Sequence, residues 1–279
     1  MKIAVIADIH ANIAALEAVS ADIDSWGADA VAVAGDIVNR GPRPRECLDF
    51  VLARERRDEW CLIRGNHERY VIHVAHDPTS RDGLDGDVRE SVRWTFNHVG
   101  TIAELAGLPE RARLTSPDSS WVRIVHATMR HDRDNLLTTT TNDELRQMVD
   151  LQAAVFCCGH THRPLIRHLD QTLVVNVGSV GLPFDRDPQA CYARIEWHTG
   201  RWQAELTRVD YDRQRAIRDM YTSGLLDDCP ATGQIILAEL EDARPYMARW
   251  VATYDTQVRE GRMTAEESVE RFLAEQRAG

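Results

Sequence analysis

Two histidines separated by one residue lie near the middle of this 279-residue chain, in His160-Thr161-His162. They follow a short apolar run at 153–156, which predicts a buried strand. In an extended turn, residues two apart point the same way, so both imidazoles can face one crevice. Neutral histidine is the commonest metal ligand in proteins. The stretch therefore predicts a metal site at the end of a strand, and a solvated polar turn is the alternative.

Three other apolar runs, near the N-terminus, are also followed by polar residues that can bind metal. The runs at 2–7, 30–34 and 60–63 predict strands, and segments with helical spacing separate them. Open α/β sheets bind their ligands at the carboxyl edge of the strands. We therefore expect one site to collect the polar residues that follow the three runs: Asp8, His10, Asp36, Asn66 and His67.

The strand ends together supply two carboxylates, one amide oxygen and four imidazoles. Such a set suits two borderline divalent ions that share one carboxylate. Two ions about 3.5–4 Å apart can clamp a phosphate and lower the pKa of a bridging water. Two dications offset by two carboxylates leave positive charge that attracts a phosphate ester. The expected ligands are Asp8, His10, Asp36, Asn66, His126, His160 and His162.

The composition is that of an ordinary globular protein, with 43% hydrophobic and 28% charged residues. A net charge of −11 argues against nucleic acid as a partner, because binding to a phosphate backbone needs a basic surface. The six cysteines form no C-x-x-C pair and indicate free thiols in a reducing compartment. No apolar run reaches the length of a membrane span, and the N-terminal run is too short for a signal peptide. We therefore expect a cytoplasmic protein without a membrane partner.

Five motifs occur in the order seen in calcineurin-like metallophosphoesterases, and residues 1–210 resemble that superfamily. The motifs are Asp8-x-His10, Gly35-Asp36, Gly65-Asn66-His67-Glu68, His126 after a strand, and Gly159-His160-Thr161-His162. The stretch 176–181 and the loop 129–137 are similar to the small bacterial phosphodiesterase branch of the superfamily.

The resemblance divides the seven ligands between two ions, with Asp36 shared. Manganese, iron, nickel and zinc all suit nitrogen and oxygen donors, so the resemblance implies one of these metals without choosing among them. One ion would be bound by Asp8, His10, Asp36 and His162, and the other by Asp36, Asn66, His126 and His160.

The resemblance also implies roles for two further residues. His67 is similar to a general acid that protonates the departing alkoxide, which contributes about 10²–10⁴-fold elsewhere. Arg40 resembles the arginine that grips phosphate in protein serine/threonine phosphatases and diadenosine tetraphosphate hydrolases. A histidine that merely starts a helix and a surface arginine are the alternatives. Asn39 replaces the aspartate with which protein phosphatases support this acid, so Glu68 is considered as a substitute support.

The expected fold is a four-layer αββα sandwich of two mixed sheets with a C-terminal helical appendage. The β-α units predict one sheet, and later short β-branched runs predict an antiparallel set in the other. Residues 1–210 would form the metallophosphoesterase domain, with an excursion at about 71–111 that is irregular, contains helical patches at 88–99 and 102–107, and acts as a lid. Residues 211–279 would form the helical appendage, with a lid and a homo-oligomer contact as the two roles considered.

The expected activity is metal-dependent hydrolysis of a phosphate ester by attack of a metal-bridging hydroxide. A small-molecule or nucleotide phosphodiester is the first choice of substrate. A phosphomonoester, including a protein phosphoserine, and a dinucleoside polyphosphate are the alternatives that Arg40 suggests. A non-catalytic scaffold of the same fold is the competing class. Such a scaffold can lose metal ligands without consequence, whereas this sequence keeps all seven together with His67.

Overall fold

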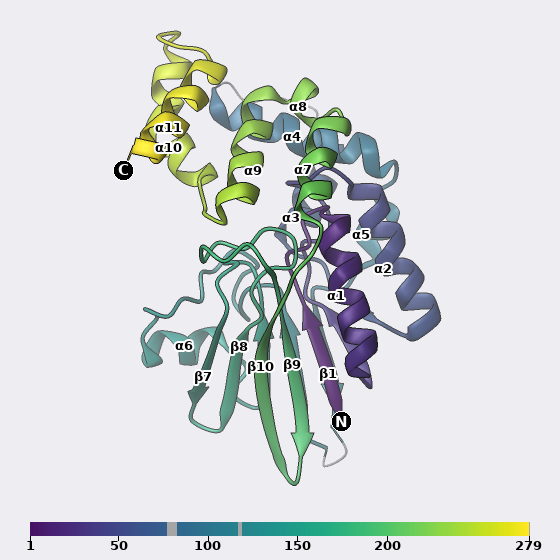
Figure 1. Cartoon of the computed structure of the whole chain (residues 1–279). Coiled ribbons are helices and arrows are strands. Elements are labelled where there is room, and N and C mark those ends of the chain that lie inside the picture. Colours follow the sequence, from purple (N-terminus) through teal and green to yellow (C-terminus); the bar gives the residue numbers. More distant parts are fainter. Residues whose placement is uncertain (77–82, 117–118, 279) are drawn as a thin grey trace.

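Two five-stranded sheets lie face to face at the centre of the molecule. The computed structural model describes residues 1–76, 83–116 and 119–278. Each sheet combines parallel and antiparallel pairs, so both are mixed. The strands occupy the lower half of Figure 1, and the C-terminal helices lie above them. The predicted sandwich of two mixed sheets with C-terminal helices is confirmed. The prediction that all the later short runs belong to the second sheet is wrong, because residues 190–209 pair with the N-terminal strand in the first sheet.

The first sheet has the strand order β10-β9-β1-β2-β3, in which β1, β2 and β3 are parallel. Its strands are β1 (Lys2–Ile6), β2 (Ala30–Val33), β3 (Cys61–Leu62), β9 (Ala190–His198) and β10 (Arg201–Val209). The second sheet has the order β4-β5-β6-β8-β7, in which β5, β6 and β8 are parallel. Its strands are β4 (Arg111–Thr115), β5 (Trp121–Val125), β6 (Val155–Cys158), β7 (Leu165–Leu169) and β8 (Thr172–Asn176).

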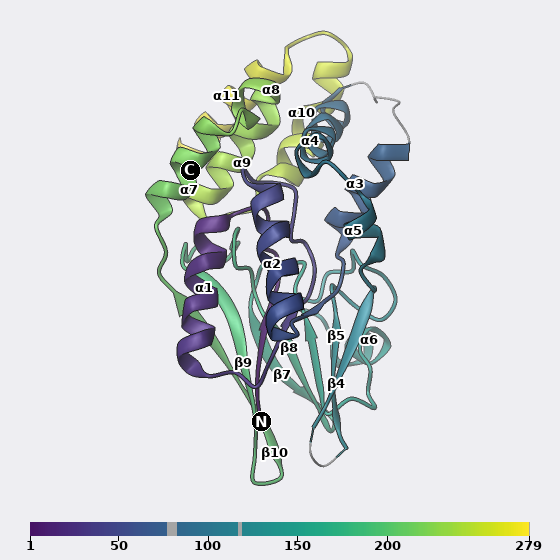
Figure 2. The same cartoon turned by 90° about the vertical axis from the view of Figure 1, so that its right-hand side faces the viewer.

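Alternation of side chains along the strands builds the layers. In β1, Ile3 and Val5 face the second sheet, whereas Ala4 and Ile6 face the helices α1 (Ile13–Trp26) and α2 (Pro44–Asp58). These two helices run side by side along one face of the molecule (Figure 2). In β6, Phe156 and Cys158 pack outward with α6 (Asn142–Met148). The four layers follow from these paired faces.

The excursion predicted at 71–111 is more helical than expected. It contains the end of α3 (Asn66–His76), then α4 (Leu84–Val99) and α5 (Ala103–Gly107), and residues 77–82 lie outside the described chain. The predicted helical patches at 88–99 and 102–107 are confirmed. The prediction that the rest of the segment is irregular is wrong, because α3 extends to His76 and α4 begins at Leu84. A role as a lid stays a prediction.

The C-terminal segment is a group of helices. They are α7 (Arg213–Thr222), α8 (Leu225–Asp228), α9 (Pro230–Asp242), α10 (Met247–Arg259) and α11 (Ala265–Ala278). Trp250 and Phe272 lie in an apolar core of their own between α9, α10 and α11. The division into domains at residue 210 stays a prediction. None of the helices in the described residues is long and apolar enough to cross a membrane.

Candidate dinuclear metal centre

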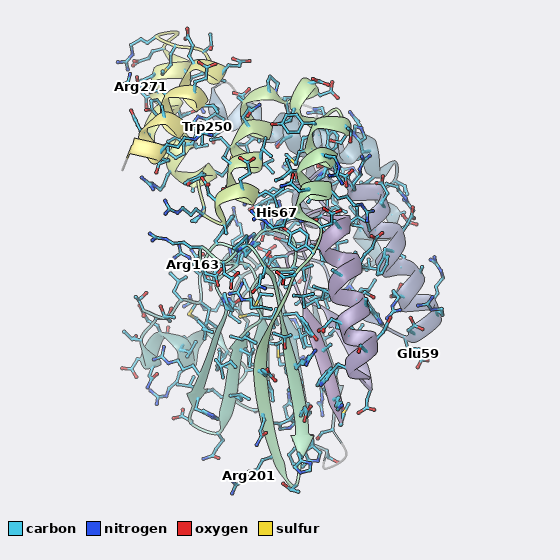
Figure 3. The ribbon with its side chains drawn as sticks, in the orientation of Figure 1. Glu59, His67, Arg163, Arg201, Trp250 and Arg271 are labelled. Carbon is cyan, nitrogen blue, oxygen red and sulfur yellow. The ribbon has the colours of Figure 1, made fainter. Side chains whose placement is uncertain are left out.

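The polar residues that follow five strands meet at one edge of the sandwich. Asp8 and His10 follow β1, Asp36 follows β2, and Asn66 opens α3 just after β3. His126 follows β5, and His160 and His162 follow β6. The labelled His67 marks this edge in Figure 3, where it lies beneath the C-terminal helices. All seven predicted ligands are therefore brought to one place.

The backbone at this edge adopts an uncommon conformation. Left-handed φ angles are rare for residues other than glycine, and such strain concentrates at functional sites. The surrounding loops hold the backbone there: His10 N donates to Asp36 O at 3.0 Å, and Asp8 N donates to Gly35 O at 3.1 Å. Five of the seven expected ligands have positive φ: Asp8 (54°), His10 (46°), Asp36 (55°), His160 (68°) and His162 (54°).

Three of the histidines are oriented by main-chain carbonyls. In each, Nδ1 lies within hydrogen-bond distance of a buried backbone oxygen, so the proton belongs on Nδ1 and the lone pair on Nε2. Metal-binding histidines are held in this way, because the second bond fixes both tautomer and ring orientation. The bonds are His10 to Asn39 (3.1 Å), His126 to Ala34 (2.8 Å) and His162 to Leu182 (2.5 Å).

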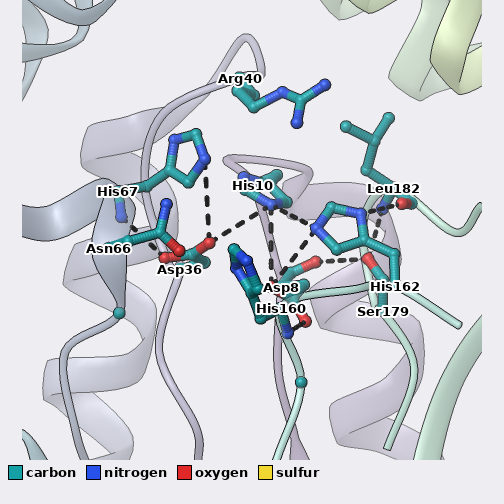
Figure 4. Close-up of polar contacts among 12 residues, drawn as sticks. Asp8, His10, Asp36, Arg40, Asn66, His67, His160, His162, Ser179 and Leu182 are labelled. Carbon is teal, nitrogen blue, oxygen red and sulfur yellow. Dashed lines mark hydrogen bonds and ion pairs between the residues drawn. The ribbon is translucent and has the colours of Figure 1, made fainter. Parts of the chain in front are cut away.

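Side chains that could hold an ion form three groups among the described residues, and the group of His10, Asp36 and His67 links the other two. The ligand atoms of Asp8, His10 and His162 lie within 4.8 Å of one another, and those of Asp36, His126 and His160 do so too. Asp36 Oδ2 lies 3.8 Å from His10 Nε2, a contact drawn in Figure 4, and 3.2 Å from His126 Nε2, so this oxygen is near a histidine of each of these two groups. The remaining expected ligand belongs with the second group, since Asn66 Oδ1 lies 2.8 Å from His126 Nε2.

Two buried carboxylate oxygens without hydrogen bonds in the described part of the chain indicate whether these residues could bind metal ions. Asp8 Oδ1 and Asp36 Oδ2 are buried and have no hydrogen-bond partner among the described residues. A buried, unpaired carboxylate oxygen is costly, and coordination of a metal is one of the few ways to stabilise it. His162 Nε2 lies 3.4 Å from the first of these oxygens, and its lone pair faces the same space. The residues therefore fit divalent ions.

The pKa values of the histidines in the metal-free chain diverge. Burial lowers the pKa of His10 well below its usual value and that of His160 to about 4. Burial also opposes protonation of His126, but the nearby charge of Asp36 outweighs burial and raises the pKa of His126 to about 10. A metal ion entering the second group therefore has to displace a proton at neutral pH.

Glu68 organises the loop that carries Asp36, a role that the sequence analysis missed. Its fully buried carboxylate accepts hydrogen bonds from the main-chain nitrogens of Asp36 (2.8 Å), Ile37 (2.8 Å), Val38 (3.1 Å) and Gly65 (2.7 Å). Both oxygens are used by these four donors. The suggestion that Glu68 supports the ring of His67 is therefore wrong. The spacing of Glu68 in the Gly-Asn-His-Glu motif was the only signal for it.

His67 lies beside the donor groups and is held by Asn39. Its main-chain nitrogen donates to Asp36 Oδ1 at 2.9 Å, and its Nε2 lies 3.9 Å from Asp36 Oδ2. Asn39 Nδ2 lies 2.7 Å from His67 Nδ1, and Asn39 Oδ1 accepts a bond from Thr95 of α4 at 3.1 Å. An amide nitrogen only donates, so Nδ1 of His67 accepts and a neutral ring carries its proton on Nε2.

Arg40 lies on the same side of the metal centre as His67 (Figure 4). Its guanidinium forms an ion pair with Glu239 of α9, and it lies over the ring of Phe184 at 5.5 Å. The prediction of a phosphate-binding arginine stays open, and so does the ligand assignment of the seven residues.

The model of the calcineurin-like phosphoesterase superfamily domain matches residues 1–200. The chain belongs to this superfamily. It is a hydrolase that acts on phosphate esters, and its clustered ligands agree with the metal dependence of the family. The expected family and enzyme class are confirmed.

The phosphoesterase also resembles individual proteins over most of its length. It is 28% identical to an uncharacterized protein of Methanocaldococcus jannaschii, over 77% of this chain and 89% of that protein. A solved metallophosphoesterase from Sphaerobacter thermophilus has a TM-score of 0.66 and 26% identity, over 87% of this chain and 100% of that one. A hypothetical protein from Pyrococcus horikoshii has a TM-score of 0.73 and 18% identity, over 88% and 99% of the two chains. Because 87% and 88% of this chain are covered, both similarities extend past the last strand into the C-terminal helices.

Proposed function

We propose that the protein is a phosphodiesterase that uses two divalent metal ions, drawn from manganese, iron, nickel and zinc, to hydrolyse a small-molecule or nucleotide phosphodiester. The observation that carries the proposal is the pair of buried oxygens, Asp8 Oδ1 and Asp36 Oδ2, that face histidine Nε2 atoms. When bound, two such ions lower the pKa of a water to near neutrality and neutralise charge on the phosphate.

The seven ligands would divide between two ions. Asp8, His10 and His162 would hold one ion, and His126, His160 and Asn66 would hold the other. Asp36 would bridge them, because its Oδ2 lies near His10 and near His126. The carbonyl bonds to Nδ1 would fix the tautomer and orientation of the three rings, with each Nε2 directed at the ions.

His67 and Arg40 would act on the substrate. His67 has its Nε2 directed toward Asp36, and the imidazolium form of the ring would give its Nε2 proton to the departing alkoxide and become neutral. Arg40 would bind a phosphate oxygen through its free N–H groups. The preference for a diester rests on the resemblance of residues 176–181 to the small bacterial phosphodiesterases. In the structure, Asn176 Nδ2 donates to Gly159 O (2.8 Å) and thereby steadies the His160-Thr161-His162 turn.

The test combines metal analysis with a panel of esters. Chelator-treated protein is reloaded with manganese, iron, nickel or zinc and assayed on bis(p-nitrophenyl) phosphate, p-nitrophenyl phosphate and diadenosine tetraphosphate. We expect two ions per chain and a higher kcat/KM on the diester. Asp36→Asn should lose ions and activity, while Asp170→Asn, at the exposed β7–β8 turn, should behave as wild type. One ion per chain at saturation would refute the dinuclear site, and a higher kcat/KM on the monoester would refute the substrate class.

A further inference from the structure

Glu239 of α9 is a buried carboxylate directed at the active-site edge. Its side chain is 1% exposed. One oxygen accepts main-chain hydrogen bonds from Tyr246 (2.8 Å) and Met247 (2.9 Å), where the chain turns from α9 into α10. The other oxygen pairs with Arg40, 199 residues away in sequence. The carboxylate therefore connects the turn between two C-terminal helices to the loop after β2.

Arg40 is held on several sides by this contact and its surroundings. Asn39 and Arg40 both have left-handed φ angles, 68° and 59°. The guanidinium lies over Phe184, whose ring stacks on that of the expected ligand His162 with centroids 4.3 Å apart. Nη2 pairs with Glu239, while Nε is buried and has no hydrogen-bond partner among the described residues.

Docking of the helices alone does not explain a carboxylate at this position. Other ion pairs also join the C-terminal helices to the first half of the chain, and these are more exposed. Asp219 pairs with Arg43 at 2.7 Å, with side chains 15% and 28% exposed, and Arg215 pairs with Glu17 at 2.5 Å near 40% exposure. A fully buried carboxylate carries a larger desolvation cost than these pairs. An additional role for Glu239 would account for its burial.

We propose that Glu239 is a positioning residue of the active site, which holds Arg40 so that its remaining N–H groups meet the substrate phosphate. The C-terminal helices are then part of the phosphate-binding site. A guanidinium fixed through one nitrogen still offers a fork of donors to an anion, and prior fixation lowers the entropy lost on binding. This assignment rests on the proposed hydrolysis of phosphate esters.

Glu239→Gln tests the assignment with little change in shape. The amide oxygen can keep the bonds from Tyr246 and Met247, while the amide nitrogen faces Arg40 and no longer attracts it. In metal-loaded protein we expect the inhibition constant of inorganic phosphate and the KM for bis(p-nitrophenyl) phosphate to rise about tenfold, as for loss of one charged hydrogen bond. Metal content should be unchanged. Asp219→Asn is the matched control, since it breaks another ion pair to the same helices without touching Arg40.

Arg40→Met separates positioning from docking. When Arg40→Met is already present, adding Glu239→Gln should change the inhibition constant of phosphate less than twofold. The double variant should have a higher Tm than Arg40→Met alone, because Arg40→Met leaves the buried carboxylate of Glu239 unpaired. The assignment is overturned if Glu239→Gln weakens phosphate no more than Asp219→Asn does, or if its effect persists without Arg40. If Glu239→Gln is insoluble, Glu239→Asp replaces it in both comparisons, because the shorter side chain keeps the charge but moves the carboxylate away from Arg40.

The outcome for the wild type distinguishes the two proposals. If the metal-loaded wild type hydrolyses no ester, the proposed function fails. Phosphate binding by calorimetry then decides the role of Glu239 by the same comparison of variants. If the wild type is active and the two glutamate variants resemble Asp219→Asn, only the positioning role fails.

Discussion

Asn39→Asp should make His67 more basic, because it places a charge where the structure has an amide. Burial lowers the pKa of His67 to about 3 in the metal-free chain, despite the opposing charge of Asp36. Asn39 Nδ2 lies 2.7 Å from His67 Nδ1, so an aspartate would bring its carboxylate to hydrogen-bond distance of the ring. Thr95 could continue to donate to the other oxygen, which keeps the new side chain in place.

The magnitude follows from the charge and its distance. A carboxylate within about 4–6 Å of a cation shifts a pKa by about 1–3 units in favour of the charged form. Each unit corresponds to about 1.4 kcal/mol, so the imidazolium gains about 1.4–4 kcal/mol relative to the neutral ring. The pKa of His67 should therefore rise from about 3 to about 4–6 in metal-free protein.

NMR titration of the metal-free protein measures this shift directly. Labelling of the histidine rings gives one resonance per side chain, and the signal that is lost in His67→Gln identifies His67. Asn39→Ser serves as the control, because it removes the amide without adding charge. An unchanged pKa in Asn39→Asp would refute the reasoning, since it would mean that the side chain at position 39 does not face Nδ1.

Three further predictions concern the metal centre and the helical layer. His67→Gln should keep both ions and lose about 10²–10⁴-fold in kcat on an alkyl ester but far less on a p-nitrophenyl ester, and equal losses would exclude a proton-donor role. Gly65→Ala should lose metal affinity and about 1–3 kcal/mol of stability, measured by calorimetry and urea unfolding, because its Cβ would collide with the Asp36 carboxylate. Gly107→Ala, which meets nothing within 4 Å, is its control. Burial and nearby acids raise the pKa of Asp87 in α4 from 3.8 to about 6, so the folded chain binds the proton more tightly and stability falls as pH rises from about 4 to 6. Asp87→Asn should therefore raise the free energy of unfolding at pH 8 by about 1 kcal/mol or less after solvent screening, and should leave it unchanged at pH 4. A gain in stability that is the same at both pH values would contradict this.

The positions of the expected metal ligands were predictable because each lies within a few residues of the end of an apolar run. A buried strand is recognisable from its apolar residues, and the residue after it has to lie at the sheet edge. Asp8, Asp36 and His126 all satisfy this rule. The edge itself is common to both sheets, so local patterns were sufficient to predict that distant residues meet.

Elements without a strong apolar pattern were missed. The strand β4 (Arg111–Thr115) is an edge strand with polar and apolar residues mixed, and its backbone pairing with β5 holds it in place. The helix α6 (Asn142–Met148) is short, and its signal is a capping box between Thr141 and Glu144 rather than a long amphipathic repeat. Local sequence is a weak guide to both, since neighbouring segments determine that they form.

The pairing of Arg40 with Glu239 illustrates a different limit. Motifs report residues that lie near each other in sequence or recur in a family, and the superfamily model ends at residue 200, before α9 begins. In the sequence, Glu239 stands in the helical stretch Leu237-Ala238-Glu239-Leu240, where a single acid among apolar residues resembles the edge of an amphipathic helix. A cation can stabilise that acid when it is buried, and the fold places Arg40 there. If Arg40 binds the substrate as proposed, its position depends on a segment outside the residues that the family model matches. We therefore expect deletion of the C-terminal helices to disrupt the proposed phosphate-binding site as well as the fold.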